Sequence, residues 1–168
     1  MRFRYNKLMK LFIIVSILLS LVPGCAHVVS DDLRRQVNEG IPVASLFENP
    51  EDYKGEIVVL GGAIAGSRNT NEGTYIEVVE KELDYQGRPK YSDETHGRFI
   101  VLHDGFLDTA IFSTGRYITV AGEVIGKRIQ PLGEINYSYL FIKSRELYLV
   151  QPGERFPVQF GIGIWHTF

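Results

Sequence analysis

Hydrophobic and polar positions alternate in short runs along most of the chain after residue 56, and glycine-rich turns separate these runs. The clearest run is 74–81, in which odd positions place Tyr75 and Val79 on one side and even positions place Ile76 and Val78 on the other. A two-residue period is typical of β-strands, whose successive side chains point to opposite faces. The same criteria predict five strands, at residues 57–65, 74–81, 98–103, 117–125 and 137–150.

These strands predict an all-β fold class with a minor helical part. Gly61-Gly62 inside the first run indicates a bulge or a close approach of the backbone to a neighbour. Residues 106–112, between the third and fourth strands, are compatible with a helical turn. Three strands, a short helix and two further strands are the element order of the OB-fold. We therefore expect a small five-stranded, OB-like, partly closed barrel.

The first 24 residues have the pattern of a secretory signal peptide. Four basic residues in the first ten positions precede an apolar run at 11–22, which is too short to cross a hydrocarbon core of about 30 Å as a helix. The run leads into Val22-Pro23-Gly24-Cys25, and a small residue directly before the only cysteine resembles the lipobox of bacterial lipoproteins. The resemblance implies a diacylglycerol and an N-acyl chain on Cys25 as the covalent lipid, and no other cofactor is expected. The alternative is a secreted protein with an incidental buried cysteine.

The residue after the cysteine bears on location. Ala26, rather than an aspartate, is similar to the sorting signal of lipoproteins that are exported to the outer membrane. Several acyl chains on one cysteine hold a protein firmly at a bilayer, whereas one chain gives only marginal binding. We therefore expect a lipid-anchored protein of the cell outer membrane whose domain faces the periplasm.

The chain divides into four segments: a signal peptide at 1–24, a lipid-anchored cysteine and tether at 25–42, a β-barrel domain at 43–150, and an aromatic C-terminal extension at 151–168. The tether contains one short helix with Ser30 as a candidate N-cap and Gly40 after its end, and its few apolar residues predict weak docking. Residues 43–47 are compatible with one more helical turn. In the extension, apolar residues at nearly every even position of 156–168 favour an added edge strand or packed tail, with contact to a membrane surface or a partner as the alternative.

The charge balance disfavours nucleic acid as a partner. The chain has 18 basic and 20 acidic residues and a formal net charge of −2, but four of the basic residues lie in the first ten positions. Without these four, 14 basic residues stand against 20 acidic ones, whereas nucleic-acid binding rewards clustered Lys and Arg. The single cysteine excludes a disulfide scaffold, and the length fits one globular domain.

Patterns typical of nucleophilic or metal catalysis are weak. Ser67 and Ser113 lie in turn sequences without a recognisable base nearby, and the cysteine is assigned to the anchor. The four histidines are far apart in the sequence. His96 and His103 are predicted to point to opposite faces of one strand, so we expect no metal site.

Paired carboxylates could act as acid and base on a glycan. Glu77 with Asp84, and Asp104 with Asp108, are candidates. Nothing in their spacing distinguishes them from solvated loop acids, so a hydrolase of envelope polymers is the least favoured hypothesis.

Three arginines each adjoin a glycine at the edge of a strand or turn: Arg88, Arg98 and Arg116. A guanidinium fixed in this way can make bidentate bonds to a carboxylate. The favoured interpretation is that these arginines hold loops in place, with partners among Asp84, Asp108 and Glu134. The alternative is an anion or glycan site on the barrel face, where OB-like barrels often bind oligosaccharides or oligonucleotides. The candidate ligand-binding residues are Arg98, Arg116, Tyr75 and Tyr137.

Several short motifs recur in one order along the chain. They include Tyr53-Lys54-Gly55, Gly61-Gly62, Gly87-Arg88-Pro89, Gly97-Arg98-Phe99, Gly105-Phe106-Leu107-Asp108, Thr119-Val120-Ala121-Gly122 and Gly133-Glu134. With the lipobox, this ordered set resembles the Slp-type starvation-inducible outer-membrane lipoproteins, from the signal peptide to about Tyr148. The resemblance implies an outer-membrane location and an association with stationary phase or stress. It implies no catalytic residue, because the family has no established catalytic activity.

We therefore expect a non-enzymatic structural or interaction module of the bacterial envelope, tethered through Cys25, with an envelope protein or a glycan as its partner. The alternative is a binding module for an anionic glycan or a cell-wall fragment, which would use the barrel face.

Overall fold

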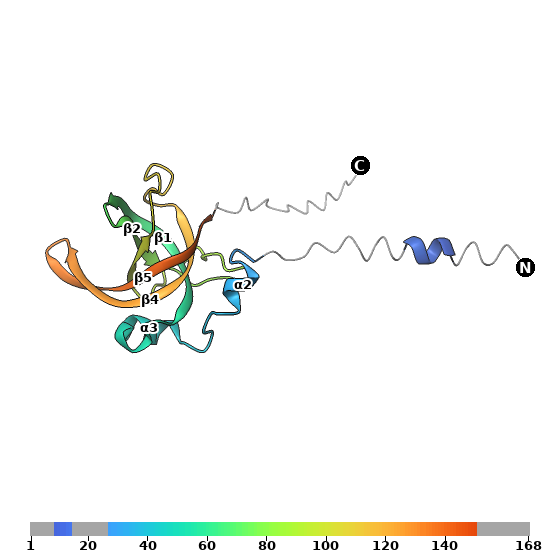
Figure 1. Ribbon diagram of the computed structural model, residues 1–168, viewed down its shortest axis with the longest axis horizontal. Helices are drawn as coiled ribbons and strands as arrows, with labels where there is room; N and C mark the ends of the chain where they lie inside the picture. Colours follow the sequence, from blue (N-terminus) through green and yellow to red (C-terminus); the bar gives the residue numbers. More distant parts are fainter. Residues whose placement is uncertain (1–8, 15–26, 151–168) are drawn as a thin grey trace, which may run out of the picture.

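The computed structural model describes residues 9–14 and 27–150 (Figure 1). Cys25 and the C-terminal extension at 151–168 lie outside the described residues, as does most of the signal peptide, so what the sequence predicts for them stays a prediction. Residues 9–14 are helical and exposed. In the part of the chain that is described, no helix has the length and apolar character needed to span a membrane.

Five strands form one closed ring. They are β1 (Ile57–Thr70), β2 (Gly73–Glu80), β3 (Arg98–His103), β4 (Tyr117–Leu132) and β5 (Ile135–Val150). Their order around the barrel is β1-β2-β3-β5-β4, and β4 pairs back with β1. All neighbours are antiparallel except β3 and β5, which are parallel. The predicted all-β, OB-like barrel is confirmed.

Three strands are longer than predicted. β1 continues to Thr70 and β4 to Leu132, beyond the ends of the predicted strands, and β5 begins two residues earlier, at Ile135. In β4, residues 126–132 pair with β5, for example Arg128 opposite Tyr139. Pairing with β5 therefore extends β4 beyond the point at which the hydrophobic pattern of β4 ends. The resulting β4–β5 hairpin projects beyond the rest of the barrel, with its tip drawn in orange (Figure 1).

The predicted helical turn between β3 and β4 is reduced to one hydrogen-bonded turn. The Phe112 amide donates to the carbonyl of Asp108 at 2.9 Å, and no helix is assigned within 106–112. The loop is held instead by the start of β2, because the Leu107 amide donates to the Thr74 hydroxyl at 2.9 Å. The barrel thus keeps the OB-like strand order without a helix at this position.

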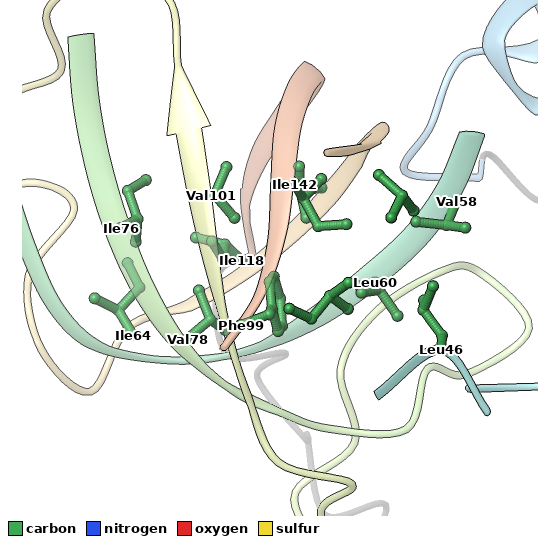
Figure 2. Packing of buried hydrophobic residues seen from close by; sticks show 13 residues of the cluster. Leu46, Val58, Leu60, Ile64, Ile76, Val78, Phe99, Val101, Ile118 and Ile142 are labelled. Atoms are coloured by element: carbon green, nitrogen blue, oxygen red, sulfur yellow. The ribbon is translucent and has the colours of Figure 1, made fainter. Parts of the chain in front are cut away.

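The barrel interior is filled by aliphatic side chains and one phenylalanine (Figure 2). The cluster consists of Leu46, Val58, Leu60, Ile64, Ile76, Val78, Phe99, Val101, Ile118, Val120, Val124, Leu140 and Ile142. Gly62 allows β1 to approach β2 closely: a Cβ on Gly62 would lie 2.0 Å from the carbonyl oxygen of Val79. The close backbone approach predicted from Gly61-Gly62 is confirmed.

Short helices precede the barrel: α2 (Asp31–Arg34), α3 (Val43–Glu48) and the 3-10 helix η1 (Pro50–Tyr53). The Ser30 hydroxyl accepts the Leu33 amide at 3.4 Å, so the predicted N-cap of α2 is confirmed. The predicted helical turn at 43–47 is confirmed as α3, whose Leu46 is 1% exposed and belongs to the barrel core. Figure 2 shows Leu46 at the edge of this cluster, near Val58.

The segment around α2 docks more firmly than its composition predicts. Val29 and Leu33 are 1% and 6% exposed, and both pack against β1 and β4. Ser30 donates its amide, at 3.0 Å, and its hydroxyl to the Glu146 carboxylate of β5. The prediction of weak docking is wrong, because it counted apolar residues and could not include a polar partner 116 residues away.

Candidate ligand-binding face

A second apolar cluster lies on the outside of the barrel, where side chains of β2, β3 and β5 point away from the core. Its buried members are Tyr75, Ile100 and Tyr139, and the side chains of Leu102, Tyr137 and Phe141 pack against them. The cluster alternates along each strand with the core, so that Tyr75 directly precedes the core residue Ile76. We call these six residues the aromatic face.

Four aromatic rings give this face a fixed surface. The rings of Tyr75 and Phe141 are parallel, with an interplanar angle of 6° and centroids 6.1 Å apart. Tyr137 and Tyr139 meet edge to face, with centroids 4.8 Å apart. Such pairs contribute about 0.5–1.5 kcal/mol beyond the burial of their area. Because all four residues lie on paired strands, their positions are set by the sheet before any ligand arrives.

Two arginines cover the ring of Tyr75. Arg68 lies opposite Tyr75 in the β1–β2 register, and its guanidinium carbon is 4.6 Å from the ring centroid. Arg128 comes from the β4–β5 hairpin, with its guanidinium carbon 5.0 Å from the centroid of Tyr75 and 5.3 Å from that of Phe141. Its Nη1 also donates to the Tyr75 hydroxyl at 3.0 Å. Each guanidinium therefore has a cation–π contact, which is worth about 0.5–2 kcal/mol.

The charges of these two arginines have no direct counter-ion among the residues that the structure describes. Within residues 9–14 and 27–150, neither Arg68 nor Arg128 forms a salt bridge. The one acid linked to the pair is the exposed Glu72, whose carboxylate accepts the Tyr75 hydroxyl rather than a guanidinium N–H. The aromatic face therefore presents two positive groups, although the domain as a whole is acidic.

Arg98 has a different environment on the same face. Its Nη1 lies 2.6 Å from Oε1 of Glu77, and the Tyr139 hydroxyl donates to the same oxygen at 3.2 Å. Burial, and then the Glu77 charge, raise the pKa of Tyr139 above its ordinary value. The Arg98 amide donates to the Tyr137 hydroxyl at 3.1 Å. Arg98 is thus a neutralised, structural member of the face.

A hollow of about 200 Å³ opens beside Tyr75. It is lined by Gly66, Ser67, Arg68, Tyr75, Glu77, Ile100 and Gln130. The lining combines one guanidinium, one carboxylate, an amide, a hydroxyl and an aromatic ring, so it offers hydrogen-bond donors and acceptors around an apolar floor. A larger hollow of about 250 Å³ lies elsewhere, between the segment around α2, α3 and the loop at 83–87.

Three of the four predicted ligand-binding residues, Tyr75, Tyr137 and Arg98, come together on the aromatic face, and their role as ligand contacts stays a prediction. Arg116 lies elsewhere. It directly precedes β4, where its carbonyl accepts the Ile64 amide at 2.8 Å, twelve residues before Arg128 in the same strand region.

Sequence reasoning missed Arg68, Arg128 and Phe141. Both arginines fall outside the strands predicted at 57–65 and 117–125, whereas they are strand residues that reach the face from β1 and β4. One signal was available in β5, where Tyr137, Tyr139 and Phe141 occupy every second position. Three aromatic residues in that alternation indicate a continuous aromatic surface on one side of a strand.

The carboxylates that could have formed catalytic pairs have other partners. Glu77 is bound by Arg98 and Tyr139, and Asp104 lies 3.1 Å from Nζ of Lys143. The Asp84 carboxylate accepts the backbone amides of its own loop, at 2.8 and 2.9 Å. Asp84 therefore holds the 84–88 loop through its amides. Arg98 pairs with Glu77 and not with any of the predicted partners Asp84, Asp108 and Glu134, so that prediction is wrong for Arg98.

The histidines also have local partners. His96 Nδ1 lies 3.2 Å from the buried Glu80 carboxylate, which also accepts the His96 amide. His103 Nδ1 lies 2.9 Å from the Ser144 hydroxyl oxygen. Among the residues that the structure describes, no three His, Cys, Asp or Glu side chains are grouped so that they could hold a metal ion.

Fold and face together define a small OB-like barrel module with a preformed aromatic surface. The chain belongs to the outer membrane lipoprotein Slp family, whose model matches residues 22–160. The match begins within the lipobox and continues past Tyr148, the limit expected from the sequence motifs, into the C-terminal extension.

One curated relative is the uncharacterized lipoprotein YeaY of Escherichia coli (strain K12), which is 28% identical over 94 residues. The alignment covers 56% of this chain and 48% of that protein, so the chain spans about half the length of this relative.

Two solved structures show a distant likeness. A putative aspartyl-tRNA synthetase from Leishmania major Friedlin has a TM-score of 0.41 and 12% identity, over 73% of this chain and 22% of that chain. A small single-stranded DNA-binding protein from Streptomyces coelicolor has a TM-score of 0.37 and 15% identity, over 57% of this chain and 94% of that chain. Both likenesses are too distant to inform function.

Proposed function

We propose that this outer membrane lipoprotein is a non-enzymatic binding module of the bacterial envelope that works through its aromatic face. The family match supports the membrane location. The observation that carries the proposal is the aromatic face itself: four rings on paired strands, with Arg68 and Arg128 left without counter-ions among the described residues. Charge placed there adds little to stability, whereas it suits recognition of a partner.

The non-enzymatic part of the proposal is supported by the structural use of the candidate acids. A general acid or base must be free to exchange a proton with a substrate. Glu77 is bound to Arg98 and Tyr139, Asp84 caps its own loop, and Asp104 pairs with Lys143. These contacts assign each of the three side chains to holding strands or loops.

The anchor part of the proposal is that Cys25 carries the lipid and that the barrel faces the periplasm. We expect the wild-type chain in the outer-membrane fraction, with a mature N-terminus that mass spectrometry identifies as an acylated Cys25. The Cys25→Ser variant should keep its signal peptide and be absent from the outer-membrane fraction. Protease added to intact cells should spare the barrel and cleave it only after the outer membrane is opened. A Cys25→Ser chain that stays in the membrane and is processed normally would refute the anchor.

The binding part is tested by photo-crosslinking in intact cells. A photoreactive residue at Gln130, which lines the hollow, should form a defined adduct with a partner. The matched control position is Arg145, whose side chain contacts Glu123 and Gln36 near α2, away from the face. Adducts of equal yield at both positions, or none at Gln130, would contradict a role for the aromatic face.

Two finer points complete the proposal. An association with stationary phase or stress follows from the family resemblance, and it predicts that the amount of protein per cell rises on entry into stationary phase. The alternative function is binding of an anionic glycan or a cell-wall fragment, which is favoured by the two guanidinium groups above Tyr75.

A further inference from the structure

We infer that the hollow beside Tyr75 receives one anionic sugar unit of an envelope glycan, with the carboxylate or phosphate of the sugar bound by Arg68 and Arg128. This inference rests on the proposed binding role of the aromatic face and specifies its ligand class. It also assigns the charge contacts to two residues that the sequence pattern did not single out, in place of Arg98.

The anionic part follows from the state of the two guanidinium groups. A guanidinium has five N–H donors in a planar fork, and stacking on a ring leaves its edge free for an acceptor. Arg128 uses one donor on the Tyr75 hydroxyl, and Arg68 is exposed. Arg68 lines the hollow, and the Arg128 guanidinium, which reaches the face from β4, lies 5.0 Å from the centroid of the Tyr75 ring that forms part of the same lining. Arg98 is excluded from this role because the Glu77 carboxylate, 2.6 Å from its Nη1, already neutralises its charge.

The sugar part follows from the shape and lining of the hollow. At about 200 Å³ it is smaller than the 300–1,000 Å³ that is typical of whole-ligand pockets, so it fits one unit of a longer chain. Tyr75 and Ile100, which are 4% and 3% exposed, form a small apolar floor against which one edge of a sugar ring can pack. Ser67, Gln130 and Glu77 offer donors and acceptors for ring hydroxyl groups.

A polymer with regularly repeated charge fits this geometry less well. Nucleic acid is bound by a track of basic groups along its backbone, whereas here two cations lie against a single ring. Glu72 accepts the Tyr75 hydroxyl and Glu77 lines the hollow, so a polymer with a phosphate on every unit would bring further negative charge next to these carboxylates. The geometry therefore points to one charge beside one ring, and an acidic peptide serves as the competing probe in the test.

The test uses the full-length lipoprotein in a neutral detergent and isothermal titration calorimetry with four probes. These are a galacturonic acid trimer, a phosphorylated glucosamine disaccharide, a neutral galactose trimer and a tri-glutamate peptide. We expect at least one acidic sugar to bind at least tenfold more tightly than the neutral trimer and the peptide. Its affinity should fall as salt is raised. The stronger of the two acidic sugars then identifies carboxylate or phosphate as the natural group.

Variants link this binding to the two arginines. Arg68→Ala and Arg128→Ala should each lower the affinity for the acidic sugar at least tenfold. Arg145→Ala, on the side near α2, should bind the sugar as tightly as the wild type does. Arg68→Lys and Arg128→Lys keep the charge but lose the planar fork, so they should lie between wild type and alanine. A cooperative thermal transition that lies above the temperature of the binding experiment in each variant shows that the loss is not a loss of fold.

Several results would overturn the inference: equal affinity for acidic and neutral sugars, preference for the peptide, absence of sugar binding, or full affinity in both arginine-to-alanine variants. If the sugars fail while the Gln130 crosslink persists, the ligand class is wrong and the proposed binding function stands. If both fail, the aromatic face is not a binding surface.

Discussion

The inner and outer sides of the same strands have opposite chemistry. In β2, Ile76 and Val78 point into a core of aliphatic side chains, whereas Tyr75 and Glu77 point outward into a cluster of rings and charged groups. The inner side obtains its free energy from burial alone, and the outer side combines burial with unpaired charge. The comparison teaches that stability and recognition are separated here by one residue along a strand. Substitutions one position apart should therefore affect different properties.

The largest effect is expected on the inner side. Phe99 is 0% exposed and touches the centre of the core, so Phe99→Ala should reduce the free energy of unfolding by about 3–5 kcal/mol. Chemical denaturation followed by circular dichroism measures this loss. A loss below about 1 kcal/mol would show that the interior is not the principal source of stability.

A second large effect is expected where β1 and β2 approach each other. A Cβ at Gly62 would lie 2.0 Å from a backbone oxygen, so Gly62→Ala should reduce the free energy of unfolding by about 1–3 kcal/mol. Gly66→Ala is the matched control in the same strand, because a Cβ at that position meets no atom within 4 Å. Equal unfolding midpoints for the two variants would contradict the close packing of these strands.

A smaller effect is expected on the outer side. Tyr75→Phe keeps the buried ring but removes the hydroxyl that bonds Glu72 and Arg128. The free energy of unfolding should therefore fall by about 0.5–1.5 kcal/mol. The same denaturation experiment applies, with Tyr85→Phe as control because that side chain is 79% exposed. A loss as large as that of Phe99→Ala would erase the distinction between the two sides.

The Glu77–Arg98 pair should contribute still less to stability. Both side chains are about one-third exposed, and pairs of this kind contribute about 0–1 kcal/mol. Glu77→Gln should instead be visible in the titration of Tyr139. Burial and Glu77 together raise the pKa of that phenol, so removal of the Glu77 charge should lower the pKa while burial keeps it above the ordinary value. Ultraviolet titration of tyrosinate in wild type and variant measures the difference, and an unchanged titration curve would rule out this coupling.

The smallest effect is expected at the docked N-terminal segment. Burial would raise the pKa of Glu146, but hydrogen bonds from Ser30 and Tyr148 outweigh it, so the pKa lies below its ordinary value of 4.5. A carboxyl group with a lowered folded-state pKa stabilises the fold above its unfolded-state pKa and loses that contribution as the pH falls through the folded-state pKa. Hydrogen exchange at the Ser30 amide should therefore accelerate as the pH is lowered below about 4.5, after correction for the intrinsic rate. In Glu146→Gln this acid-induced change should be absent, and its persistence there would assign it to another group.

The sequence predicted the parts of this molecule that depend on local pattern. Alternation located all five strands, and Gly61-Gly62 marked the close approach, because both signals come from residues that are neighbours in the chain. The N-cap at Ser30 was predictable for the same reason. The ends of β1 and β4 were not, because polar residues such as Arg128 become strand residues only through pairing with a partner such as Tyr139.

The candidate site shows the same limit. Tyr75, Tyr137 and Arg98 were predictable as outward strand residues, but charge compensation depends on contacts between strands. Glu77 neutralises Arg98 from 21 residues away, and Arg68 and Arg128 reach Tyr75 from two other strands. The pairing register of the strands therefore determines which arginine has an acidic neighbour and which is free to bind an anion.

The docked segment around α2 also determines how far the barrel can move from a membrane. The Val28 amide is already bonded to the Gln86 carbonyl at 2.9 Å, so two residues, Ala26 and His27, lie between this fixed point and Cys25. The three Cα–Cα steps from Val28 to Cys25 span at most about 10 Å. With the proposed lipid on Cys25, this short tether would keep the whole domain within about one barrel length of the membrane surface. The β4–β5 hairpin lies at the end of the barrel opposite α2 (Figure 1). Within this distance of the membrane the local concentration of the aromatic face would be high, and a glycan would be captured only if it reaches the membrane surface.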